Sequence, residues 1–74
     1  MNDQALEILA KVRELKIKQW KDFGEFAVPY ANRFVIDLGN EFKKNADLYG
    51  EDEALRSLTE YHEDCERAAQ QVAA

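Results

Sequence analysis

Apolar residues recur at intervals of three and four along three stretches of the chain, residues 3–21, 29–48 and 51–72. This spacing predicts three amphipathic helices, because side chains three or four positions apart lie on one face of an α-helix. The positions that form these faces are Ala5, Ile8, Val12 and Leu15 in the first stretch, Ala31, Phe34, Val35, Leu38, Phe42 and Ala46 in the second, and Leu55, Leu58, His62, Cys65, Ala69 and Val72 in the third. Little of the chain is left for loops.

The two connections between these helices differ in composition. Gly50 is well placed to end the second helix, since glycine is the usual residue just past a helix C-terminus. The first connection, residues 22–28, is ambiguous, because Gly24 interrupts the first helix whereas Pro29 suits the first turn of the next one. Its large apolar residues are Phe23, Phe26 and Val28. These are too apolar for a solvated loop, so we expect the connection to fold back over the core or to meet a partner.

Three amphipathic helices with short connections predict an all-α fold, a small three-helix bundle formed by residues 1–74 as a single helical domain. The alternative, which requires a straight first connection, is a long helical hairpin that completes its core by dimerisation. A chain of 74 residues buries only about 60% of the surface that its unfolded form exposes. Its own core is therefore marginal, and a partner or second copy would add stability.

Charge is distributed unevenly along a chain that is acidic as a whole. The formal net charge is -5, and 46% hydrophobic residues with 34% charged residues are typical of a folded domain with polar outer faces. Residues 1–24 hold five basic residues against four acidic ones, residues 25–48 hold three against four, and residues 49–74 hold two against seven. The third helix thus carries the acidity.

Aromatic residues gather around the first connection. Five of the eight lie between residues 20 and 34. Most rings in so small a domain belong to its core, but a cluster too large to be covered is also what anchors a protein interface. The residues that we assign to partner binding on this basis are Trp20, Phe23, Phe26 and Tyr30. Both the core and the interface interpretation remain open for this cluster.

The outer face of the third helix supports an alternative hypothesis. Glu60, Glu63 and Glu66 give this face an array of negative charge that resembles the phosphates of a nucleic acid. Such a surface would occupy the basic groove of a nucleic-acid-binding protein. The competing interpretation is an ordinary solvated face, in which Arg56 pairs with Asp52 four positions earlier and Arg67 with Glu63.

Direct nucleic-acid binding is not expected. The lysines of the first helix alternate with glutamates, as in a solvated face, and the helix that follows the Gly50 turn begins with three acidic residues. A recognition helix in a DNA groove is usually basic.

Catalytic and metal-binding equipment is not recognisable. His62 and Cys65 lie three positions apart, but zinc requires four ligands, or three with a water, and the chain offers no second pair. We find no GxGxxG, P-loop, GxSxG or HExxH pattern. We therefore expect no catalytic residues, no cofactor and no metal, and a protein that is not an enzyme.

The single cysteine and the absence of a long apolar segment favour a cytoplasmic protein without membrane contact. Cys65 has no partner for an internal disulfide, and the first residues lack the pattern of a signal peptide. Taken together, these features favour a small acidic interaction or regulatory module that acts by binding another protein. We expect an inhibitor or adaptor of the type that bacterial or phage genomes encode, with a homodimer as a further option.

Overall fold

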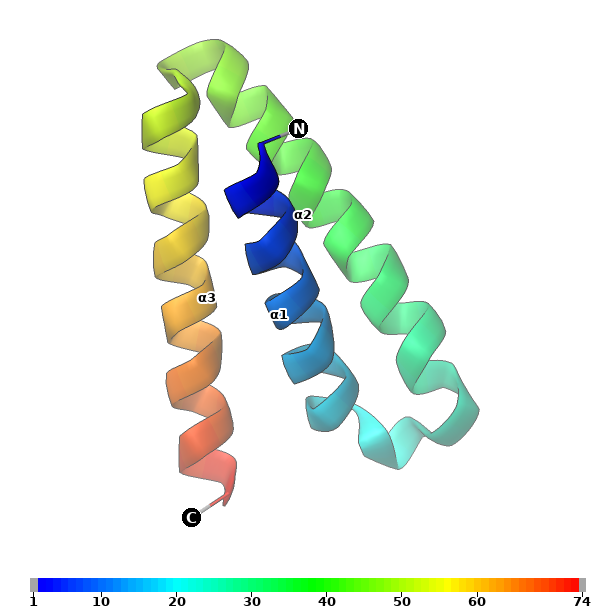
Figure 1. The fold of residues 1–74 in the computed structure, drawn as a ribbon. Coiled ribbons are helices and arrows are strands. Elements are labelled where there is room, and N and C mark those ends of the chain that lie inside the picture. Colours follow the sequence, from blue (N-terminus) through cyan, green and yellow to red (C-terminus); the bar gives the residue numbers. More distant parts are fainter. Residues whose placement is uncertain (1, 74) are drawn as a thin grey trace.

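The computed structural model describes residues 2–73, which form three α-helices and one short 3₁₀ helix (Figure 1). α1 covers Asp3–Gln19, the 3₁₀ helix η1 covers Lys21–Phe26, α2 covers Ala27–Tyr49 and α3 covers Glu51–Ala73. The chain is therefore an all-α three-helix bundle, as the hydrophobic pattern predicts. The hairpin alternative does not form, because the chain turns between α1 and α2 instead of continuing straight.

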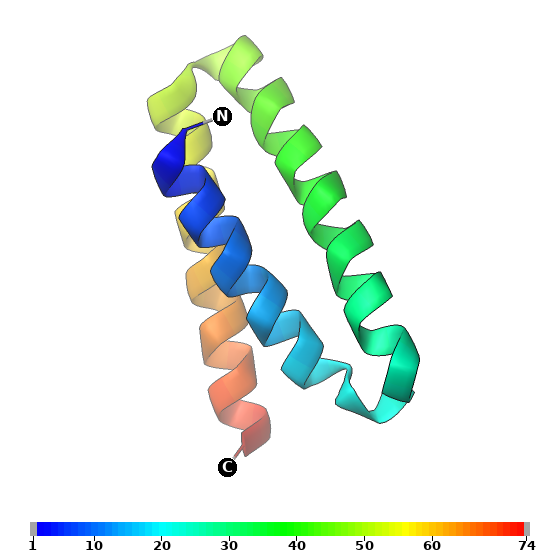
Figure 2. The same cartoon turned by 45° about the vertical axis from the view of Figure 1, so that its right-hand side comes forward.

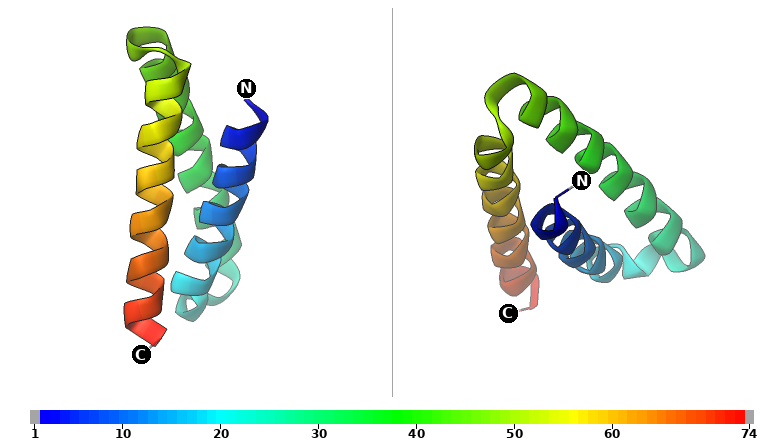
Figure 3. Two further views of the ribbon diagram at one scale, coloured as in Figure 1. Left: turned by 60° about the vertical axis from the view of Figure 1, so that its left-hand side comes forward. Right: turned by 45° about the horizontal axis from the view of Figure 1, so that its top comes forward.

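The three helices are not parallel. α2 and α3 meet at a corner and diverge from it, while α1 lies between them, with its N-terminal end near that corner (Figures 1 and 3). Turned by 45°, the molecule shows α1 crossing in front of α3, with α2 to one side of this pair (Figure 2). Side chains of α2 pack against both of the other helices. The principal extents are 37 × 25 × 17 Å, so the bundle is flat as well as small.

Gly50 forms the corner between α2 and α3, and Asn2 joins the start of α1 to this corner. Gly50 has φ +96° and ψ 156°, a backbone conformation that residues with a Cβ rarely adopt, and its N–H donates to the Ala46 carbonyl at 3.0 Å. The side chain of Asn2 caps α1 by accepting hydrogen bonds from the backbone N–H groups of its first turn. The Asn2 amide also donates to Glu51 Oε1 at 2.7 Å, so the start of α1 is joined to the start of α3.

The first connection is a kink stabilised by glycine. α1 ends at Gln19, two residues earlier than expected, and Gly24 interrupts η1 with φ +62°. α2 begins at Ala27, so Pro29 occupies its third position, where a missing N–H leaves no hydrogen bond unmade. Of the two outcomes expected of this connection, folding back over the core does not occur, and contact with a partner stays a prediction. Phe23, Phe26 and Val28 all remain exposed, because the kink directs η1 away from α3.

Buried apolar side chains occur at both ends of the bundle, because Ala27 and Ala31 near the first connection are buried, and Val12 of α1 is fully buried. The main hydrophobic cluster lies at the end nearest the corner. Its buried residues are Ala5, Leu9, Phe42, Ala54 and Leu58, with Ile8, Leu38, Ala46 and Leu55 packed against them. Phe42 is the largest buried side chain of this cluster, and the alanines opposite it allow the helices to approach. The side chain of Val72, which the periodicity placed on the apolar face of the third helix, lies outside the described part of the structure.

Candidate functional site: an exposed aromatic tip and a groove between two helices

Three aromatic side chains gather on η1 and the start of α2, at the opposite end of α2 from the Gly50 corner. Phe26 and Tyr30 stack with ring centroids 6.0 Å apart, and Phe23 meets Tyr30 edge-on at 6.1 Å. Each ring remains more than half exposed, with exposed fractions of 55% for Phe23, 54% for Phe26 and 51% for Tyr30. We call these three residues the aromatic tip. They come from η1 and the first turns of α2, and the kink at Gly24 determines where they lie.

Trp20, the fourth aromatic residue assigned to partner binding, lies in a different cluster. Its ring meets Phe34 edge-on at 5.8 Å, and Phe34 in turn stacks on Tyr61 with centroids 6.2 Å apart. All three residues are partly buried. This inner aromatic cluster therefore joins the end of α1 to α2 and α3, and the structure separates Trp20 from the aromatic tip.

A lysine lies against the inner aromatic cluster. The Nζ atom of Lys16 lies 4.8 Å from the centroid of the Phe34 ring, 5.5 Å from that of Trp20 and 6.0 Å from that of Tyr61. These distances are in the range of cation–π attraction. Spacing along the sequence does not by itself reveal this contact, because the three rings come from the end of α1, from α2 and from α3. The available signal was that Lys16 lies four positions from both Val12 and Trp20, on the face that packs inward.

Burial and a neighbouring thiol affect the hydroxyl of Tyr61. Burial of the ring, followed by hydrogen bonding and charge interaction with Cys65, raises the pKa of Tyr61 from 10.0 to about 12. Cys65 is a free, half-buried cysteine. Both residues follow the inward face of α3 one turn apart, and the hydroxyl stays protonated at neutral pH.

Most acidic side chains on the outer face of α3 already have cationic neighbours. Arg56 pairs with Glu53, and with Glu60 at 2.9 Å. The hydrogen bond from Arg56 and its positive charge lower the pKa of Glu53, whereas the pKa of Arg56 is raised in return. Glu66 lies 3.2 Å from Nε2 of His62, while Glu63 is exposed.

The ion pairs expected from four-residue spacing do not form on α3. Arg56 contacts Glu53 and Glu60 in place of Asp52, and Arg67 contacts Asp64 in place of Glu63. Residues three and four positions apart are equally near on a helix, so the rotamer of the long arginine side chain decides which carboxylate it meets. Of the three glutamates assigned to the mimic hypothesis, Glu60 is the one with an arginine or lysine partner among the described residues, whereas Glu66 contacts the imidazole of His62.

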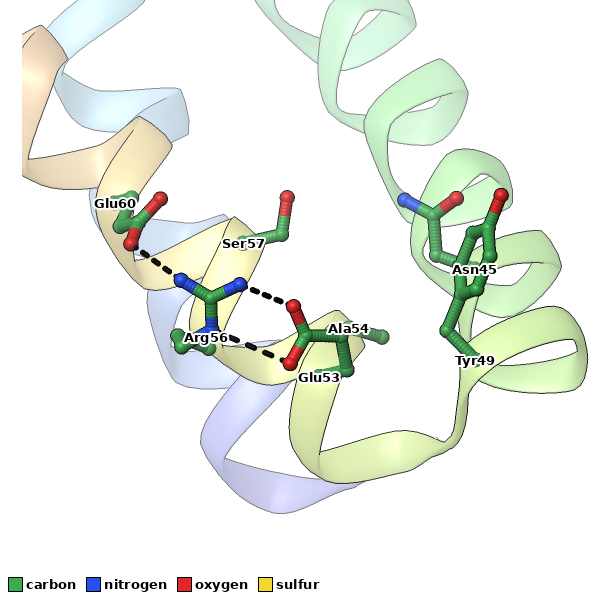
Figure 4. Close-up of a pocket in the computed structure, with 7 residues that line it drawn as sticks. All are labelled: Asn45, Tyr49, Glu53, Ala54, Arg56, Ser57 and Glu60. Carbon is green, nitrogen blue, oxygen red and sulfur yellow. Dashed lines mark hydrogen bonds and ion pairs between the residues drawn. The ribbon is translucent and has the colours of Figure 1, made fainter.

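An open groove follows the junction of α2 and α3. Two adjoining hollows of about 300 and 240 Å³ share Asn45, Ala54 and Ser57 as lining residues. In the first hollow, Asn45 and Tyr49 of α2 stand opposite Ser57 of α3 (Figure 4). The other residues that line the two hollows are Leu38, Glu41, Phe42, Glu53, Arg56, Leu58, Glu60 and Tyr61. We call this surface the α2–α3 groove; among the described residues its lining comes from these two helices alone.

The only pair of metal-ligand residues considered in the sequence was His62 and Cys65, and no metal site was expected there. Within the described part of the chain, no group of three or more histidine, cysteine, aspartate or glutamate side chains is arranged to hold a metal ion. The side chain of His62 contacts Glu66 and is 14% exposed.

Among the described residues, no helix is both long enough and apolar enough to cross a membrane.

Comparison with known proteins returns no relative for this chain. No protein family, no curated protein sequence and no solved structure matches it. Its function must be inferred from its own residues.

Proposed function

We propose that this chain is a protein-binding module whose aromatic tip inserts into a partner protein. One observation carries the proposal. Phe23, Phe26 and Tyr30 are more than half exposed, and Tyr30 contacts both of the other rings. Large rings that a protein orders but leaves in water are typical anchors of protein interfaces.

The geometry of the tip favours binding for an energetic reason. Each ring is held by contact with a neighbouring ring, so little side-chain entropy is lost when a partner covers it. With about half of each ring exposed, the three side chains offer on the order of 300 Å² of apolar surface. At about 25 cal/mol per Å², covering this area contributes up to about 7 kcal/mol before the cost of association.

The size of the tip also limits what it does alone. A stable interface buries about 800 Å² on each partner, so the tip supplies less than half of one. The partner must therefore contact further residues around the rings, or hold the tip in a pocket that covers it on several sides. The same limit applies to a homodimer, which needs contacts in addition to the aromatic tip.

A regulatory role as an inhibitor or adaptor extends this proposal. The small size and the lack of a recognisable catalytic motif in the sequence support binding over catalysis. The lone cysteine supports a reducing, cytoplasmic setting, and the short chain is of the kind that bacterial or phage genomes encode.

The test compares the chain with a variant that lacks the three rings. Phe23→Ala, Phe26→Ala and Tyr30→Ala are combined, and the matched control combines Ile36→Ala with Leu48→Ala, because Ile36 and Leu48 are as exposed as the tip residues. We expect the tip variant to lose partner capture from extracts of the source organism, and any self-association in sedimentation equilibrium. The control should retain both, and circular dichroism should show helix in all three proteins. Equal capture by the two variants would contradict the proposal.

Salt separates this proposal from nucleic-acid mimicry. If the tip binds through apolar contact, capture should change little between low and high salt, because salt screens interactions between charges but not contacts between apolar surfaces. Mimicry predicts steep loss of capture with salt, and loss on charge reversal of Glu60, Glu63 and Glu66. Arg56, which pairs with Glu60, offsets part of the negative charge on this face and makes the mimic the less supported of the two functions.

A further inference from the structure

The α2–α3 groove has an apolar floor and an acidic rim. Phe42, Ala54 and Leu58 lie at the bottom of the groove, and each is at most 5% exposed, so they close the groove towards the core but offer little surface themselves. Leu38, Tyr49 and Tyr61 line the sides of the same groove. Tyr49 is 69% exposed, the highest value among the exposed large apolar side chains of the described residues. A chain that covers this groove gains apolar contact without moving the core.

The rim of the groove carries three carboxylates and one guanidinium. Glu41 comes from α2, whereas Glu53, Glu60 and Arg56 come from α3. Arg56 contacts both glutamates of α3, as the dashed lines of Figure 4 show. Glu41 has no cationic neighbour among the ion pairs of the described residues, and no lysine lines the described groove. The rim therefore has a surplus of two negative charges and attracts a cationic occupant.

The walls of the groove favour a helical occupant. Both walls are α-helices, whose backbone N–H and C=O groups bond within their own helix, so an extended peptide would find no backbone partners there. A helical occupant forms its backbone hydrogen bonds within itself, and it presents side chains at intervals of three and four to the groove. The lined length, from Leu38 to Tyr49 on α2, corresponds to about 16 Å, or about three turns of a docked helix.

Charge disfavours a second copy of this chain as the occupant of the groove. Groove-to-groove pairing would bring two acidic rims together, and like charges across an interface oppose association. On α1, two of the four cations already have acidic neighbours, since Lys11 lies 3.8 Å from Glu7 and Arg13 lies 3.3 Å from Glu14, and a third, Lys16, lies against the inner aromatic cluster.

We propose that the α2–α3 groove binds a cationic amphipathic helix of a partner protein. The apolar side chains of that helix lie against Leu38, Tyr49 and Tyr61. Its lysine or arginine side chains reach Glu41 on one rim and Glu60 on the other. This surface is separate from the aromatic tip, so the inference does not rest on the function proposed above.

The probe is a synthetic leucine–lysine peptide long enough for about four helical turns, carrying a fluorescent label. Its binding to the full chain is followed by fluorescence anisotropy at near-physiological salt, where charges more than about 8 Å apart are largely screened. A leucine–glutamate peptide of the same length is the control. We expect the lysine peptide to bind and the glutamate peptide not to bind.

Two charge variants locate the contact. Glu41→Lys with Glu60→Lys reverses the rim, and Glu7→Lys with Glu14→Lys makes the same change in net charge on α1. We expect the rim variant to weaken binding about tenfold or more and the α1 variant to change it by less than about threefold. Equal loss in both variants would show that the peptide only senses the overall acidity of the chain, and would overturn the proposal.

Two apolar variants test the groove itself. Tyr49 lines the groove, whereas its neighbour Leu48 is similarly exposed but is not among the lining residues. We expect Tyr49→Ala to weaken binding several-fold and Leu48→Ala to leave it unchanged, with amide NMR shifts in the peptide complex confined to the lining of the groove. Shifts centred on Phe23, Phe26 and Tyr30 would overturn the proposal. Self-association that only the rim variant removes would assign the groove to a second copy and would also overturn it.

Discussion

Lys16→Met removes the ammonium group that lies over the inner aromatic cluster while keeping an unbranched side chain of similar length. The Nζ atom is nearest to the Phe34 ring, at 4.8 Å, and lies farther from the Trp20 and Tyr61 rings. A cation over an aromatic ring contributes about 0.5–1 kcal/mol at an exposed site and about 2 kcal/mol when desolvated. Lys16 is partly buried and shares one charge among three rings, so we expect about 1 kcal/mol in total.

That magnitude is a noticeable share of the stability of so small a protein. At about 0.05–0.15 kcal/mol per residue, 74 residues give a free energy of unfolding of about 4–11 kcal/mol. Methionine is also more apolar than lysine, and the apolar contact that it gains offsets part of the loss. A single substitution therefore understates the interaction, and a double-mutant cycle is needed to isolate it.

The cycle combines Lys16→Met with Phe34→Leu and measures urea unfolding of the four proteins by circular dichroism. We expect a coupling free energy of about 0.5–1 kcal/mol between the two positions. The control cycle replaces Lys16→Met with Lys18→Met, because Lys18 is an exposed lysine of the same helix. Its coupling with Phe34→Leu should lie within about 0.3 kcal/mol of zero. If both cycles give the same coupling, the lysine contributes nothing through the rings and the reasoning fails.

Two further predictions concern the corner and the tyrosine of α3. Gly50→Ala should lower the free energy of unfolding by about 1–3 kcal/mol in urea titrations. The cause is backbone strain at φ +96° and not a steric clash, since a Cβ there would meet no neighbouring side chain within 4 Å. A loss below about 0.5 kcal/mol would mean that the corner tolerates other conformations. Because the pKa of Tyr61 is raised to about 12, the folded state holds this proton more tightly than the unfolded state, so the resulting stability is complete below about pH 10 and is lost as the pH rises towards 12. Urea midpoints measured across that interval should fall more for the unmodified chain than for Tyr61→Phe, and parallel curves would refute this account.

The sequence predicted those features of the fold that depend on neighbours within one helix. The apolar positions at intervals of three and four located all three helices, because helical geometry alone brings such residues to one face. Gly50 was identified as the end of the second helix because a glycine there adopts a positive φ without strain. The third helix was recognised as the acidic one directly from its residues.

The candidate surfaces depended on relations that one helix does not define. Trp20, Phe23, Phe26 and Tyr30 form a single aromatic cluster in the sequence, yet Trp20 packs against Phe34 while the other three remain in water. The division follows from the kink at Gly24, which directs η1 away from α3. The contact of Lys16 with three rings likewise requires side chains from α1, α2 and α3 at one point, and no local spacing indicates this.

The groove between α2 and α3 is likewise not predictable from the spacing of residues within one helix. Its lining residues were assigned from the sequence to the apolar or polar face of a helix, but whether those faces meet or leave a hollow depends on the angle between the helices. Periodicity and glycine thus determined the helices, their inward faces and the acidic character of α3. Only the tertiary structure decided which aromatic rings are covered, which carboxylates Arg56 contacts and where a groove stays open, because interhelical angles and side-chain rotamers are set by packing between segments distant in the sequence.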